Sequence, residues 1–321
     1  MKYRRSARNL RALMLAAGWV LATAATPAPL PWRDAAPAPR LQEWFAKMVM
    51  PPVALSLPRM DKVRYTRDLS YSSSSNPNLR MDVYQPPEVP EGELRGAVIF
   101  IHGGADASTK PKDWGNYQSW GRLVAASGLV AVTFSHRLNF PDTQVLEGAE
   151  DVAAVLSTVK ANARRFGIDP SKLCVIAFSA GGPLLAPYLV DAPEEIKCAA
   201  GYYPFMDIRQ SAAHREHESA ETLQRFSNIV AISRPGRKTP LLIVRGGRDE
   251  IPTLLNSIDR FAAAALEANY PLALLNHPEG PHGFENQLTD ERTKEIIAQT
   301  LAFFHDHIGT PAYVRQSAEG A

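Results

Sequence analysis

The chain has little cysteine, little net charge and no apolar run long enough for a secure membrane span, and each shortage narrows what the protein can be. Its 321 residues include 2 cysteines, Cys174 and Cys198, although export would favour disulfides. Both lie in apolar runs, so we expect two buried free thiols, with a bridge between neighbouring strands as the alternative. The formal net charge of +2 leads us to expect no nucleic-acid partner. With 45% hydrophobic and 21% charged residues, the composition is globular and excludes disorder, collagen and coiled coil.

The first 24 residues have the pattern of a secretory signal. They carry five basic side chains and no acid, which leaves a net charge of −3 for the remainder. The apolar run 12–22 is shorter than the roughly 20 residues that a spanning helix needs. Small residues follow at Ala22-Thr23-Ala24, so we expect cleavage after Ala24 or Ala25 and a periplasmic or secreted product without stable membrane insertion. An uncleaved N-terminal anchor is the alternative.

A single catalytic domain is expected after a linker. Prolines are dense from 25 to 58, which precludes regular helix over much of that stretch and predicts a linker. The domain is then expected from 59 to 310, with folding proper beginning near Met60 and a frayed tail at 311–321. The serine-rich tract 72–78 is predicted to be a turn between the first two strands.

Apolar runs of strand length alternate with segments of helical period through this domain. Several runs are continuous, which suits a parallel sheet covered by helices on both faces. The strand candidates are 79–84, 97–101, 130–134, 173–178, 199–203, 241–244 and 272–275. The helix candidates are 116–126, 147–165, 180–190, 252–268 and 290–305, the last with Thr289 as N-cap.

The segment from Leu173 to Gly182 predicts a nucleophile elbow. An apolar strand ends at Ser179, and a tight strand-to-helix turn there would lift the hydroxyl above the sheet edge. Crowding around such a turn requires small residues two positions before and two after, which Ala177 and Gly181 supply.

A glycine-containing loop upstream predicts an oxyanion hole. The strand candidate 97–101 runs into His102-Gly103-Gly104-Ala105, and backbone N–H groups of Gly103, Gly104 and Ala180 could stabilise a tetrahedral oxyanion. An ordinary glycine turn is the alternative. We interpret His102 as a structural hydrogen-bonding residue of the loop, because it follows the wrong strand for a general base.

An acid and a base follow two later strand candidates. Asp249 comes just after 241–244 and is the predicted acid, with Glu250 as its competitor. His282 lies in the loop after 272–275 and is the predicted base, with His277 as the alternative. Ser179 needs a base to take its proton, and an acid fixes the tautomer of that base. The chain order Ser, Asp, His is that of α/β-hydrolases.

The chain thus resembles the α/β-hydrolase esterase and lipase superfamily, nearest to its hormone-sensitive-lipase-like and dienelactone-hydrolase-like branch. The resemblance implies an eight-stranded, mostly parallel sheet with helices on both faces, a short cap insertion at about 205–238, an acyl-serine intermediate, and neither metal nor cofactor. The supporting residues are His102-Gly103-Gly104, Asp151, 167–170, Ser179-Ala180-Gly181-Gly182, Asp249 and His282-Gly283-Phe284.

The cap segment and nearby aromatic residues bear on the substrate. Charged residues dominate the cap, which disfavours a membrane-docking lid and therefore a long-chain triglyceride lipase. Its His214 and His217 have the spacing of metal ligands but no third ligand. Tyr203 and Phe205 follow a strand end and Trp114 follows the predicted oxyanion loop; all three are expected either to line the substrate pocket or to be core.

The sequence therefore predicts a serine carboxylesterase that cleaves a small or medium acyl ester of a small molecule. The alternatives are a serine peptidase of the same fold and a non-catalytic binding protein on a hydrolase scaffold.

Overall fold

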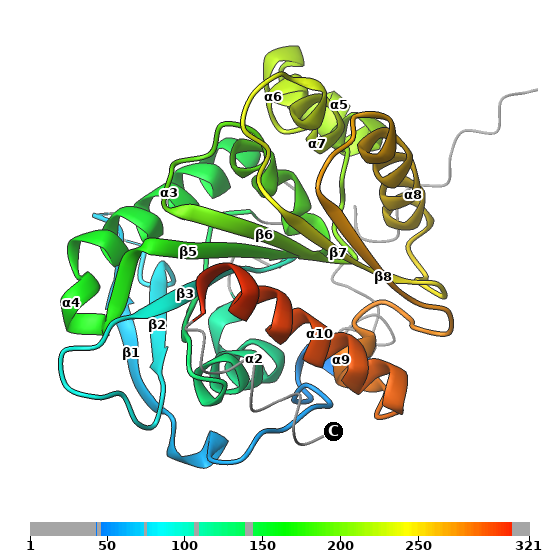
Figure 1. Ribbon diagram of the computed structural model, residues 1–321. Helices are drawn as coiled ribbons and strands as arrows, with labels where there is room; N and C mark the ends of the chain where they lie inside the picture. Colours follow the sequence, from blue (N-terminus) through cyan, green and yellow to red (C-terminus); the bar gives the residue numbers. More distant parts are fainter. Residues whose placement is uncertain (1–42, 44–45, 74–75, 106–108, 139–143, 310–321) are drawn as a thin grey trace, which may run out of the picture. The chain divides into compact units, whose positions relative to one another are not determined.

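One eight-stranded sheet organises the protein (Figure 1). The computed structural model describes residue 43 and residues 46–73, 76–105, 109–138 and 144–309. The strand order is β1-β2-β4-β3-β5-β6-β7-β8, with β2 antiparallel to both its neighbours and all other pairs parallel. The strands are β1 (Arg64–Ser70), β2 (Arg80–Gln85), β3 (Arg95–Ile101), β4 (Val130–Phe134), β5 (Ile168–Phe178), β6 (Ile196–Tyr202), β7 (Leu241–Gly246) and β8 (Leu272–His277).

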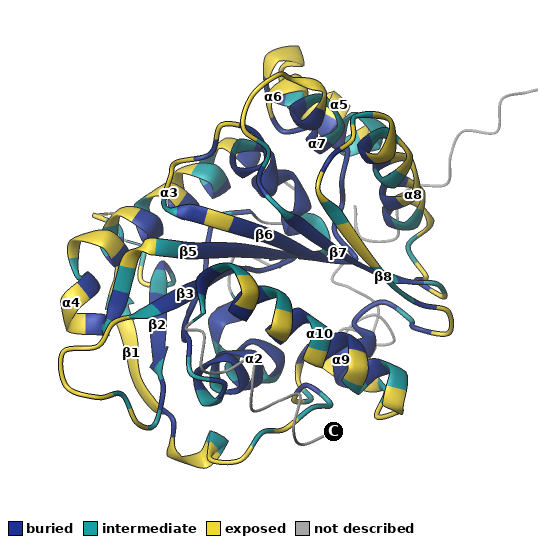
Figure 2. Cartoon of the chain, viewed as in Figure 1, coloured by how far each residue is buried: buried dark blue, intermediate teal, exposed yellow. Residues whose placement is uncertain are grey.

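This sheet confirms the eight-stranded, mostly parallel α/β-hydrolase architecture that the resemblance implied. Each of the seven apolar strand candidates overlaps a strand. The eighth, β1, had no apolar run to predict it, because all but one of its residues are exposed on the sheet edge. Figure 2 shows the consequence: β4 and most of β3 are dark blue, as are β5 and β6 toward their C-terminal ends, while exposed residues gather on β1 and the outer faces of the helices.

Helices cover both faces of the sheet (Figure 1). On one face lie α2 (Gly115–Ala126) and α10 (Glu291–Ile308), and on the other lie α3 (Val145–Ala161) and α8 (Pro252–Glu267). The predicted helix 147–165 breaks at Asn162, after which α4 (Ala163–Phe166) is a separate turn. The N-cap of α10 is Asp290, not Thr289, because the Asp290 carboxylate accepts the N–H of Thr293 at 3.0 Å.

The segment after the strand β5 is a 3₁₀ helix rather than the predicted α-helix. It is η3, Ser179–Tyr188, and it contains Pro183 and Pro187. Each proline removes one backbone donor and so weakens the regular α-helical hydrogen-bond pattern.

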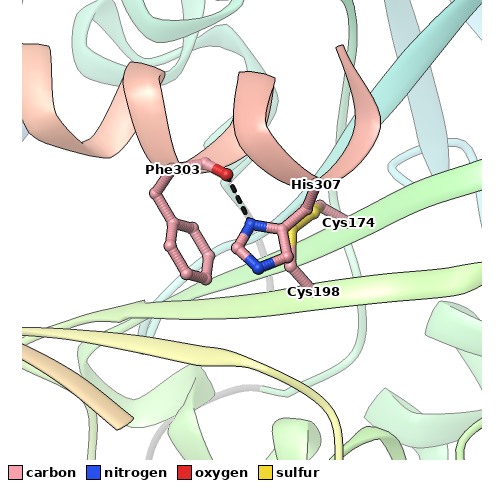
Figure 3. The surroundings of a disulfide bond; sticks show 4 residues. All are labelled: Cys174, Cys198, Phe303 and His307. Atoms are coloured by element: carbon pink, nitrogen blue, oxygen red, sulfur yellow. Dashed lines mark hydrogen bonds between the residues drawn. A yellow bond between two sulfur atoms is a disulfide. The ribbon is translucent and has the colours of Figure 1, made fainter. Parts of the chain in front are cut away.

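The two cysteines are bridged, so the expectation of free thiols is wrong. Cys174 of β5 and Cys198 of β6 are register partners in adjacent strands, and a disulfide joins them with a Cα–Cα distance of 4.8 Å. The strand register brings the two residues together, and the sequence did not determine that register. Figure 3 shows α10 crossing the bridge, with the His307 ring donating to the Phe303 carbonyl at 2.7 Å.

The packed body begins before residue 59, so the predicted linker 25–58 is too long. We call residues 46–58 the N-terminal strap. Val53 is buried in it and donates its N–H to Ser119 Oγ at 2.9 Å. The Asn286 amide donates to the Met48 carbonyl at 3.1 Å. The strap therefore packs on the domain rather than leading to it.

The predicted signal 1–24, the first part of the linker and the tail 311–321 lie outside the described residues. Within the described part of the chain, no helix combines the length and apolar character that crossing a bilayer requires.

Candidate active site

Ser179 stands at the turn between β5 and η3. Its φ is +50°, in the left-handed region that non-glycine residues rarely adopt, as a strained nucleophile elbow requires. Two glycines let neighbouring backbone approach this turn. A Cβ at Gly181 would lie 2.4 Å from the His102 carbonyl oxygen, and one at Gly182 would lie 2.5 Å from the Phe205 carbonyl oxygen.

The structure brings Ser179, His282 and Asp249 into one hydrogen-bonded chain. His282 Nε2 lies 2.9 Å from Ser179 Oγ, and His282 Nδ1 lies 2.7 Å from Asp249 Oδ2. The imidazole and the carboxylate are buried, whereas Ser179 is half-buried. Because a carboxylate accepts only, Nδ1 carries the proton and Nε2 is left to accept from the hydroxyl.

The two alternative residues for acid and base have other contacts. Glu250 Oε2 accepts the backbone N–H of His282 at 3.0 Å, so it holds the loop rather than the ring. His277 Nε2 contacts Asp290 Oδ1 at 3.2 Å and Thr293 Oγ1 at 3.1 Å, at the start of α10. Asp249 also accepts the Ile251 N–H at 2.8 Å, which fixes its carboxylate in the turn after β7.

The predicted oxyanion loop lies against the nucleophile, but one predicted donor has another partner. A Cβ on Gly103 would lie 3.0 Å from the Ser179 Cβ. The Gly103 N–H donates to the Tyr117 hydroxyl at 3.1 Å, so it is already engaged. Of the three predicted donors, Gly104 and Ala180 fit the role better.

His102 has the predicted structural role. Its Nδ1 donates to the Gly103 carbonyl at 2.6 Å and its Nε2 accepts the His136 N–H at 3.0 Å, which requires the neutral ring. Burial lowers the pKa of His102 to about 4, and the ring stacks on His136 with 3.4 Å between centroids. These contacts join the loop after β3 to the loop after β4.

The three aromatic residues expected near a pocket differ in position. The Tyr203 ring lies 4.3 Å from the His282 ring, centroid to centroid. Phe205 is buried and donates its N–H to the Ser179 carbonyl at 2.8 Å. Trp114 is half-buried, 6.5 Å from the His102 ring. Tyr203 therefore contacts the base, and Phe205 supports the nucleophile turn.

One acid that lies near the predicted base was not predicted from the sequence. Glu285 is fully buried and its Oε1 accepts the Tyr203 hydroxyl at 2.6 Å. Burial raises the pKa of Glu285 to about 7. The one sequence feature that could have indicated Glu285 is its position three residues after His282, because an acid so close to a predicted base can lie near it in the fold.

Short helices occupy the segment predicted as a cap. Between β6 and β7 lie η4 (Ile208–Gln210), α5 (Ala212–His217), α6 (Ala220–Arg225) and α7 (Asn228–Ser233). His214 is buried whereas His217 is exposed, so the two do not converge. The described residues contain no group of three or more His, Cys, Asp or Glu side chains placed to hold a metal ion.

Known proteins match this chain in sequence and in fold. Residues 142–311 match a family described as the prolyl oligopeptidase family, and residues 81–192 match one described as BD-FAE. Carboxylesterase 3B of Mus musculus is 30% identical over 34% of this chain and 20% of its own length. An acetylxylan esterase of Xylanibacter ruminicola is 23% identical over 62% of this chain and 42% of its own.

The chain thus spans less than half the length of the curated relatives it matches. A solved thermophilic esterase of Thermogutta terrifontis with propionate bound is 22% identical, with a TM-score of 0.60. That alignment covers 78% of this chain and 97% of the other. The likeness establishes the α/β-hydrolase fold.

Proposed function

The chain belongs to the prolyl oligopeptidase family, and we propose that within this family it is a serine carboxylesterase. Its substrate is a small or medium acyl ester of a small molecule. The observation that carries the proposal is the continuous hydrogen-bonded chain Ser179–His282–Asp249 at the C-terminal edge of the sheet.

The geometry supports acyl transfer in two halves. His282 Nε2 takes the Ser179 proton while Oγ attacks the ester carbonyl carbon, and the N–H groups of Gly104 and Ala180 stabilise the oxyanion. The C–O bond to the alcohol breaks, and the imidazolium protonates the leaving alkoxide. Water then attacks the acyl-serine by the same route, which releases the carboxylic acid and restores Ser179.

The named relatives and neighbour support ester chemistry rather than a particular ester. One curated relative is named an acetylxylan esterase, another a carboxylesterase, and the solved neighbour holds propionate. These names point to short acyl groups.

The test is hydrolysis of p-nitrophenyl esters from acetate to palmitate. We expect a burst of p-nitrophenol and a fall in kcat/KM beyond medium chains, because pocket depth limits the acyl group. Ser179→Ala should lower kcat by at least about 10³-fold. His282→Gln should do the same, whereas the control His277→Gln should retain activity. A folded protein that turns over none of these esters contradicts the proposal.

The family description keeps a peptidase as the second candidate. Amide hydrolysis would use the same three residues but needs stronger protonation of the leaving amine by His282. Peptidyl-coumarin substrates compared with p-nitrophenyl esters distinguish the two. The esterase proposal requires the higher kcat/KM on esters.

The proposal also places the protein in an oxidising compartment, periplasmic or secreted. The Cys174–Cys198 disulfide supports this, since such bridges persist outside the reducing cytosol. Alkylation of the isolated protein before reduction should label neither thiol. Labelling of both without reductant would contradict export.

A further inference from the structure

We propose that Glu285 is a positioning residue that acts through Tyr203, placing a negative charge behind the His282 imidazole and so controlling when that base holds its proton. The inference rests on the proposed function, because it assigns regulation to the same site.

Two contacts link Glu285 to the base. The Tyr203 hydroxyl donates to Glu285 Oε1 at 2.6 Å, and the Tyr203 ring packs on the His282 ring at 4.3 Å with a tilt of 53°. Tyr203 comes directly after β6 with a φ of +37°, and its N–H donates to the Val244 carbonyl at 2.7 Å. A strained backbone at this position is maintained only where the surrounding contacts over-determine it.

Glu285 is itself held in place by backbone contacts. It lies in α9 (Phe284–Gln287), just after the loop that carries His282. Its carbonyl accepts the Ala54 N–H at 2.8 Å, so the N-terminal strap fixes it. This contact holds the backbone of Glu285 close to the loop that carries His282.

The Glu285 carboxyl has fewer hydrogen-bond partners than a buried acid with a purely structural role normally has. Glu285 is 0% exposed, and its Oε2 has no hydrogen-bond partner. Asp249, by comparison, accepts from both His282 Nδ1 and the Ile251 N–H. Buried polar atoms are normally paired, so the unpartnered Oε2 adds to the desolvation penalty of an ionised Glu285.

Of the titratable groups that act on the Glu285 carboxyl, only the His282 imidazole can carry a positive charge. The titratable groups that act on Glu285 are Tyr117 of α2, Tyr202 of β6, Tyr203 and His282. Burial raises the pKa of all three tyrosines, so they stay neutral. Burial also raises the pKa of Glu285 to about 7, against the effects of the Tyr203 hydrogen bond, a hydrogen bond from its own backbone N–H and the His282 charge. Glu285 thus changes charge in the neutral range where an imidazole base works.

When Glu285 is ionised, its negative charge favours the imidazolium form of His282. A neutral side chain at position 285 removes this effect, so His282 releases its proton more readily. Glu285→Gln removes the charge and keeps an acceptor for Tyr203. Tyr203→Phe keeps the ring over His282 but removes the hydroxyl, so the carboxyl becomes harder to ionise. Both changes should therefore act in the same direction.

The experiment is an NMR pH titration of the protein with ¹³C-labelled histidine, which does not depend on turnover. The His282 signal is assigned by its loss in His282→Gln. We expect its midpoint to move to lower pH by roughly half a unit to one unit in Glu285→Gln and in Tyr203→Phe. The double variant should move no further than the larger single change. Tyr270→Phe, which removes a buried hydroxyl bonded to the Leu189 and Thr239 carbonyls, is the matched control and should leave the midpoint in place.

The acidic limb of the kcat/KM profile on a p-nitrophenyl ester gives the second readout. It should shift with the NMR midpoint, while KM changes little. A shift in the His282 titration without ester turnover leaves the inference standing and overturns the esterase. Ester turnover with an unmoved His282 midpoint in both variants overturns the inference. Should Glu285→Gln not fold, Tyr203→Phe alone decides by the same criterion.

Discussion

At the scale of single residues, two adjacent acids contact the same histidine at different atoms. Asp249 Oδ2 contacts the ring at Nδ1, and Glu250 Oε2 accepts the backbone N–H. The first contact fixes the tautomer that catalysis needs, and the second fixes the loop. The two side chains therefore contribute differently, although they are neighbours in the chain.

Neutralising each acid in turn separates these contributions. Asp249→Asn should lower kcat by about 10³ to 10⁴-fold, because an amide donor at this position favours the wrong tautomer. Glu250→Gln keeps an acceptor for the N–H and should cost less than about tenfold. Steady-state kinetics at pH 7.5 on one ester compares them. The reverse order of losses would make Glu250 the acid.

The three triad residues could be predicted because each follows an apolar strand, and parallel strands bring such ends to one edge. Partners contributed by distant segments could not be predicted. The Tyr117 hydroxyl that engages the Gly103 N–H is on a separate helix, and Tyr203 reaches Glu285 across 82 positions. Nothing in local pattern or composition specifies such contacts.

At the scale of elements, a buried lysine in the segment after the predicted oxyanion loop forms ion pairs with acids at the edge of the sheet. Lys112 lies in η2 (Pro111–Asp113) and is 0% exposed. Its Nζ lies 2.7 Å from Asp68 Oδ1, 3.1 Å from Asp82 Oδ1 and 2.7 Å from Asp113 Oδ1. β1 and β2 are thereby connected to the segment that leads from Gly104 into α2.

Removing this lysine charge should be costly. Lys112→Met leaves the buried Asp82 carboxylate with only the more distant Arg67, whose Nε is 4.0 Å from Asp82 Oδ2, and we expect the free energy of unfolding to fall by about 3–5 kcal/mol. The exposed neighbour Lys110 is the control, and Lys110→Met should change it by less than about 0.5 kcal/mol. Urea denaturation measures both. Equal stabilities of the two variants would show that the cluster contributes nothing.

Central elements were easier to predict than peripheral ones. The buried parts of β3 and β5, residues 97–101 and 173–178, are continuous apolar runs, which suit a sheet covered on both faces. The edge strand β1 is stabilised by pairing with β2 rather than by burial, and so carries no apolar signal. The disulfide depended on strand register, and the contacts of the N-terminal strap depend on a surface formed by distant segments.

At the scale of the whole molecule, buried histidines couple folding to pH. Burial lowers the pKa of His102, His214 and His305 to about 4, and that of His136 well below its usual value. The unfolded chain then binds more protons than the native state below about pH 6.5, so stability falls on acidification. Glu285, Asp82 and Asp151 have raised pKa values and the opposite effect, but they are three groups against four.

The free energy of unfolding should therefore fall between pH 7 and pH 5, by an amount on the order of 5 kcal/mol. His214→Gln should reduce that fall by about 2 kcal/mol, because it removes one group that protonates only on unfolding. The exposed His217 is the control: its charge adds to the lowered pKa of His214 but less than burial does, so His217→Gln should change the pH dependence much less than His214→Gln. Denaturant titrations at several pH values measure the free energy of unfolding of each variant. Stability that is flat or rises toward pH 5 would contradict this account of the buried rings.

Covalent labelling of the folded protein tests most directly whether Ser179 is an activated nucleophile. After reaction with a fluorophosphonate, peptide mapping by mass spectrometry should find the added mass on the peptide that contains Ser179. Ser179→Ala should abolish the label, and His282→Gln should slow it strongly. A folded protein that stays unlabelled, or that carries the label on another serine, would contradict the assignment of Ser179, His282 and Asp249.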